Sequence, residues 1–102
     1  MGVCYDVMTY AGEYFNTRHD VAVMLLRTGV ITIDEDTMLE ELYTDDLREL
    51  SGLDIQCTNY FTGEGYYVGF EAGDWKGYQY LLDEYKRITG RDGDIYDFVR
   101  VY

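Results

Sequence analysis

Two alternating segments separated by a glycine-rich turn most constrain how this chain can fold. Apolar and polar residues largely alternate over Leu53–Phe61 and again over Tyr66–Ala72, and Thr62-Gly63-Glu64-Gly65 lies between the two segments. Successive side chains of a strand point to opposite faces, so each segment would place its apolar residues on one face. The pattern predicts an antiparallel β-hairpin with its turn at the glycines.

Helix signals lie on both sides of this hairpin. Asn16 or Thr17 can cap a helix that ends near Gly29, and Asp74 can cap a helix that ends at Gly90. Apolar residues recur at three- and four-residue spacing within both segments, which is typical of a helix with one buried face.

The two ends of the chain complete the expected fold. Residues 95–102 are rich in β-branched and aromatic side chains and predict a last strand, whereas residues 3–11 fit a helix or a strand, with a strand favoured. No repeat or linker divides the chain. We therefore expect residues 1–102 to form a single α+β domain, with a small, mainly antiparallel sheet and two to three helices packed on one face.

A third helix is expected in the most acidic part of the chain. Residues 34–54 carry nine acidic side chains and one basic side chain, Arg48, in a protein whose net charge is −12. Thr37-Met38-Leu39-Glu40 matches a capping box, and Ser51-Gly52 is a typical helix end. Five residues at helical spacing are expected to form the buried stripe of this helix: Leu39, Leu42, Tyr43, Leu47 and Leu50.

The predicted helix would carry a row of like charges on its outer face. Glu41, Asp45 and Glu49 lie four residues apart, a spacing at which each like-charged pair costs about 0.2–0.5 kcal/mol. Two interpretations remain open: a solvated acidic face that nothing binds, or a face that binds a basic protein surface.

Composition narrows the function classes. The strong negative charge disfavours direct binding to nucleic acids and to anionic membranes, because both need clustered Lys and Arg. One histidine specifies no catalytic set, and the acidic runs that start at Asp34 and Asp92 lack the glycine and glutamate that an EF-hand loop requires. We expect no enzyme activity, no metal site and no cofactor.

The cysteines and the hydropathy indicate a cytoplasmic protein. Cys4 and Cys57 are too few for a disulfide framework, and no basic leader precedes an apolar run at the N-terminus. The longest apolar run, Val21–Leu26, is far too short to cross a membrane.

The tyrosines offer a second kind of binding surface. Tyr60 and Tyr67 are expected to face away from the apolar side of the hairpin, and exposed tyrosines beside carboxylates make good interface anchors. The alternative function is therefore a tyrosine-faced interaction module or a homo-oligomeric accessory protein such as a homodimer.

The chain resembles, in character, the small acidic inhibitors carried by phages and mobile elements, namely anti-CRISPR proteins and antirestriction DNA mimics. The resemblance lies in the short length, the acidic block Asp34–Asp54 and the tyrosines interleaved with acids in "YFTGEGYYVGFEAGDW". It implies a non-enzymatic inhibitor that occupies the basic nucleic-acid-binding surface of a host nuclease, with a Cas nuclease among the candidates. The expected partner-binding residues are Asp34, Glu35, Asp36, Glu40, Glu41, Asp45, Asp46, Glu49, Asp54, Tyr60 and Tyr67.

Overall fold

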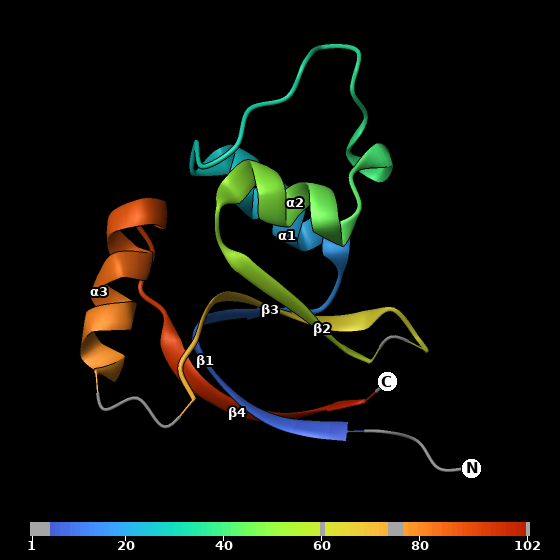
Figure 1. Cartoon of the computed structure of the whole chain (residues 1–102). Helices are drawn as coiled ribbons and strands as arrows, with labels where there is room; N and C mark the ends of the chain where they lie inside the picture. Colours follow the sequence, from blue (N-terminus) through green and yellow to red (C-terminus); the bar gives the residue numbers. More distant parts are fainter. Residues whose placement is uncertain (1–4, 60, 74–76, 102) are drawn as a thin grey trace.

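The computed structural model describes residues 5–59, 61–73 and 77–101, and it confirms the expected α+β fold. The strands are β1 (Tyr5–Phe15), β2 (Asp54–Asn59), β3 (Glu64–Glu71) and β4 (Asp94–Val101). The helices are α1 (Arg18–Arg27), α2 (Thr44–Ser51) and α3 (Tyr78–Thr89), and a short 3-10 helix, η1, covers Leu39–Glu41. Figure 1 shows α1 and α2 over the strongly curved sheet and α3 beside it.

The sheet has the order β2-β3-β1-β4, and these neighbouring strands are antiparallel. It curls so far that its edge strands meet at one parallel pair, Asn59 of β2 and Val101 of β4. Arg100 of β4 also donates to Gln56 of β2 at 2.7 Å, across the inside of the curl. The side chains of these two residues therefore lie on the concave face of the sheet, which turns away from the helices.

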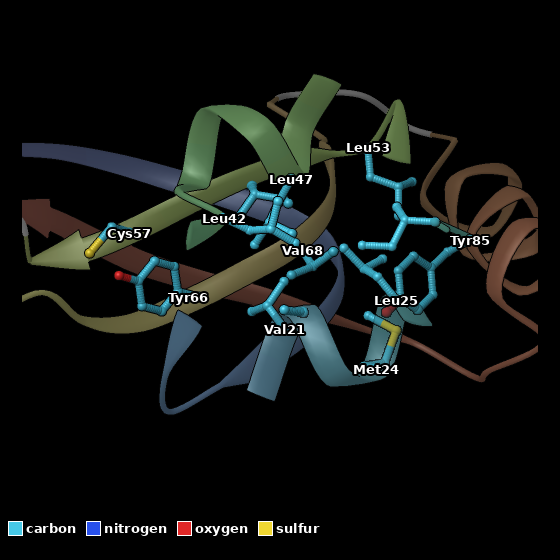
Figure 2. Packing of buried hydrophobic residues seen from close by; sticks show 13 residues of the cluster. Val21, Met24, Leu25, Leu42, Leu47, Leu53, Cys57, Tyr66, Val68 and Tyr85 are labelled. Carbon is cyan, nitrogen blue, oxygen red and sulfur yellow. The ribbon is translucent and has the colours of Figure 1, made fainter. Parts of the chain in front are cut away.

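The main core lies between the convex face of the sheet and the first two helices. Figure 2 shows Val21 and Leu25 of α1 and Leu47 of α2 packed against Val68 of β3, and all four are fully buried. Burying one such side chain contributes about 1.5–3 kcal/mol. Spacing of three or four residues along α1 places its buried residues on one side, so the predicted inward face of this helix is confirmed.

The third helix is held to the sheet by a buried polar contact. Tyr85 of α3 is fully buried, and its hydroxyl donates to the carboxylate of Glu13 on β1 at 2.7 Å. Arg91 donates to the same carboxylate through Nε and Nη2 at 2.6 and 2.8 Å. This contact joins α3 and the following turn to the C-terminal part of β1.

Most of the predicted elements are confirmed. The hairpin, the first helix with its cap at Thr17 and the last strand are all present, and Gly90 ends α3 in the left-handed conformation. The alternation is wrong at Phe61, which belongs to the turn and is exposed. The described part of α3 follows Gly77, and the predicted cap at Asp74 lies outside the described residues.

Aromatic side chains fill the concave face of the sheet. Tyr67 of β3 stacks on Phe98 of β4 with ring centres 4.0 Å apart, and Tyr10 packs edge-on against Phe98. Tyr14 and Tyr96 complete the cluster, with ring centres 5.0 and 5.2 Å from the ring centre of Tyr67. The polar side of the predicted hairpin is therefore largely the inside of the curl, where packing and not solvation decides the residue types.

Candidate functional site

The acidic segment, residues 34–49, is the strongest candidate for a binding surface, but it is not one helix. Residues 31–34 and 37–38 have no regular structure, η1 covers three residues, and α2 begins only at Thr44. The predicted capping box at Thr37 is wrong, and so is the helical row formed by Glu41, Asp45 and Glu49, because Glu41 lies in η1. Figure 1 shows the part of the segment that precedes α2 within a long loop that rises above α1 and α2.

Local hydrogen bonds explain why the helix starts late. The backbone N–H of Tyr43 donates to the carboxylate of Asp46 at 2.9 Å, which makes Tyr43 the N-cap and Thr44 the first residue of α2. Leu42 is buried in the core in an extended conformation, with φ −89° and ψ 111°. Burying Leu42 therefore takes precedence over continuing the helix. The predicted helix end is confirmed, since Gly52 is left-handed with φ 71°.

The carboxylates of the acidic segment are presented to solvent. Seven of its eight acidic residues are exposed: Asp34, Glu35, Asp36, Glu40, Glu41, Asp45 and Glu49. The eighth, Asp46, is partly buried and caps α2. The basic residue of the segment, Arg48, pairs with Asp45 and donates through Nε to the carbonyl of Ile55 at 2.7 Å. The positive charge of Arg48 is therefore already paired, and it offsets only one of the carboxylates. The surface of the acidic segment stays strongly negative.

Large apolar side chains are exposed within the same segment. Met38 and Tyr43 have 61% and 63% of their surface exposed, and Leu50 lies just beyond at 47%. Tyr43 and Leu50 were predicted to face inward, but only Leu42 and Leu47 of that predicted stripe are buried. The guanidinium of Arg18 lies 4.8 Å from the centre of the Tyr43 ring, which orients the ring without covering it. The sequence interpretation missed these exposed apolar side chains, which lie among the exposed acidic residues of the segment.

Asp54 is separated from this surface. It is the first residue of β2, and its carboxylate accepts a hydrogen bond from the hydroxyl of Tyr10. The side chain of Tyr10 is fully buried. Burial and the neighbouring Asp54 carboxylate raise the pKa of the Tyr10 hydroxyl well above its usual value. Asp54 therefore lies on the concave face of the sheet and not among the exposed carboxylates.

Of the two tyrosines that are expected to bind a partner, the structure describes Tyr67. Tyr67 does face away from the apolar side of the hairpin, but it packs inside the aromatic cluster of the concave face and is only partly exposed. Burial, Tyr14 and Tyr96 raise the pKa of the Tyr67 hydroxyl. Tyr60 lies outside the described residues.

Comparison with known proteins finds a similarity that covers most of this chain but only a small part of the matched protein. No family model matches the sequence, and no solved structure matches the chain. A stretch of 81 residues, 78% of the chain, is 31% identical to the cytoplasmic glutamate–tRNA ligase of Arabidopsis thaliana. The stretch covers 11% of that ligase, so the chain spans about a tenth of the length of this relative. In the described residues, none of the helices is long and apolar enough to cross a membrane.

Proposed function

We propose that the chain is a non-enzymatic inhibitor whose acidic segment binds the basic nucleic-acid-binding surface of another protein. A nuclease of host defence, such as a Cas nuclease, is the first candidate partner, and the proposed place of action is the host cytoplasm. A negative surface is attracted over long range to a basic cleft that normally holds phosphates, and the attraction also orients the two proteins before contact.

The observation that carries this proposal is the exposure of Met38 and Tyr43 among seven exposed carboxylates. A segment that only keeps a protein soluble has no need of large apolar side chains on its surface. Interfaces combine the two features, since charges speed the encounter while aromatic residues and Met contribute to the buried centre. Extended loops without regular structure are also frequent binding elements in compact domains.

The similarity to glutamate–tRNA ligase adds no activity to the proposal. The matched stretch is about a tenth of that enzyme, so the ligase activity that its name states is not carried over to this chain. The binding role rests on the acidic segment of this chain.

Cleavage assays test the proposal. Purified defence nucleases are incubated with DNA and rising amounts of the chain, and the cleaved fraction is measured at low and at high salt. We expect inhibition that saturates at a fixed ratio of chain to nuclease and weakens with salt. A variant with Glu40→Lys, Glu41→Lys and Glu49→Lys should not inhibit, because it reverses three exposed charges of the acidic segment.

The matched control reverses three exposed charges elsewhere. Glu64→Lys, Glu71→Lys and Asp83→Lys change the net charge by the same amount but lie on β3 and α3. This variant should inhibit nearly as well as the parent chain. Equal loss of inhibition in both triple variants would mean that net charge matters and that the acidic segment is no specific binding face.

A homodimer is a second candidate arrangement, and one observation favours it. Tyr5, Val7 and Val99 are 67%, 81% and 51% exposed, and Val7 pairs with Val99 across β1 and β4. Figure 1 shows this end of the two strands extending beyond the helices. We propose that a second copy packs on this end of the sheet. Light scattering after gel filtration should then give twice the chain mass, and Val7→Lys should return the monomer; a monomeric parent chain would rule the arrangement out.

A further inference from the structure

A surface groove with opposite charges at its two ends lies between α1 and the end of β1. The groove has a volume of about 350 Å³. Its walls come from the end of β1, from one face of α1 and from the turn before β4, and they include Tyr14, Asp20, Val23, Arg27 and Arg91. The groove is distinct from the acidic segment and from the aromatic cluster, apart from the shared Tyr14.

Helix geometry fixes the charge pattern along this groove. Asp20 and Arg27 are seven residues apart on α1, which is close to two full turns, so they lie on the same face about 10 Å apart along the axis. Val23 lies between them on that face and also lines the groove. The order along the wall is therefore a carboxylate, an apolar patch and a guanidinium.

The two charges are available for a ligand. Both residues are exposed, and neither forms an ion pair with another residue in the described part of the chain. Arg91 also lines the groove, but its Nε and Nη2 groups are held by Glu13, which balances its charge. The groove is thus close to neutral overall, with a negative and a positive end.

We propose that this groove binds a linear zwitterion with an apolar middle, such as a tripeptide with free ends. The ammonium group of the ligand pairs with Asp20, its carboxylate pairs with Arg27, and its central side chain lies against Val23. An extended chain of three residues spans about 10 Å, which is comparable to the rise along the α1 axis from Asp20 to Arg27. A simple anion fits less well, because a protein of net charge −12 repels it and Asp20 faces it inside the groove.

NMR titration of the full chain with the tripeptide Ala-Leu-Ala tests this site. Backbone amide shifts should change over residues 14–28 and at Arg91, and less elsewhere. Capping the peptide as an N-acetyl or a C-amide form removes one charge, and each form should bind about fivefold more weakly, as expected for one charge pair in a partly solvated site. Absence of shifts in the groove for the free tripeptide would overturn the proposal.

Variants of the two charged residues separate the site from weak surface binding. Arg27→Gln should weaken binding of the free tripeptide about fivefold and leave the C-amide form unaffected, and Asp20→Asn should do the same for the N-acetyl form. Lys86→Gln is the matched control, since Lys86 lies on α3 and pairs with Asp92. If the capped peptides bind as tightly as the free one, or if the Lys86 control loses as much affinity as Arg27→Gln, the proposed pairing is wrong.

Discussion

Gly12 of β1 and Gly69 of β3 pair face to face where the sheet curls, and neither position has room for a side chain. A Cβ atom on Gly12 would lie 1.9 Å from the carbonyl oxygen of Val68, and one on Gly69 would lie 2.1 Å from that of Ala11. Gly69 also has φ 148°, a conformation that side chains disfavour. The two glycines let the backbones of β1 and β3 cross closely enough for the sheet to curl.

We therefore expect Gly12→Ala and Gly69→Ala to cost about 3 kcal/mol or more in the free energy of unfolding, because backbone atoms must move apart. Urea denaturation followed by circular dichroism measures the change. Gly63→Ala is the control, since Gly63 has φ 68° but open space around its Cα, and about 1 kcal/mol is expected there. Similar losses at all three glycines would show that the close crossing is unimportant.

Two buried tyrosines should make the protein sensitive to alkali. Burial and a neighbouring carboxylate raise the pKa of both Tyr10 and Tyr85 well above the value of about 10 expected in the unfolded chain. Above that pH the unfolded state loses protons that the native state keeps, so the free energy of unfolding must fall as pH rises. The limiting slope is about 1.4 kcal/mol per pH unit for each tyrosine.

Urea denaturation at a series of pH values, from neutral to above pH 10, measures how the free energy of unfolding depends on pH. Tyr85→Phe should lower stability at neutral pH, because Glu13 loses a donor, and should flatten the alkaline slope. Tyr80→Phe, at an exposed position of α3, should leave the slope unchanged. A Tyr85→Phe variant with the parent slope would mean that Tyr85 is not kept protonated by the fold.

The carboxylate of Glu13 should contribute more to stability than any exposed ion pair on α3. It is largely buried and accepts from both Tyr85 and Arg91, so Glu13→Ala leaves two donors without their acceptor and should cost about 2–3 kcal/mol. Glu84→Ala breaks a pair with Arg87 that is closer to solvent and should cost clearly less than Glu13→Ala. Equal losses in the two variants, measured by urea denaturation, would contradict the role given to Glu13.

The sequence predicts the elements of this fold well, because their signals are local. The cap at Thr17 and the left-handed glycines at Gly52 and Gly90 act within one helical turn, and the alternation in β2 and β3 follows directly from strand geometry. These features need no knowledge of the tertiary structure.

The errors arise where tertiary packing overrides a local signal. Thr37 and Glu40 form a plausible capping box, but Leu42 is buried in the core and Asp46 caps a later start. Asp54 is predicted to belong to the acidic surface because it ends the acidic block in the sequence, and alternation cannot tell a solvated face from the inside of a curled sheet. The curl itself depends on the pairing of Gly12 with Gly69, residues 57 positions apart in the sequence.

Binding of the acidic segment to a nucleic-acid-binding surface is tested most sharply by the affinity of the chain for a purified defence nuclease. The affinity is measured at several salt concentrations, with and without a short DNA duplex as competitor. We predict that the dissociation constant rises with salt and that the duplex displaces the chain. The Glu40, Glu41 and Glu49 to Lys variant should bind at least about tenfold more weakly, while the control variant should not. Undiminished binding by that variant, or binding that the duplex leaves intact, would contradict the claim that the acidic segment occupies a nucleic-acid-binding surface.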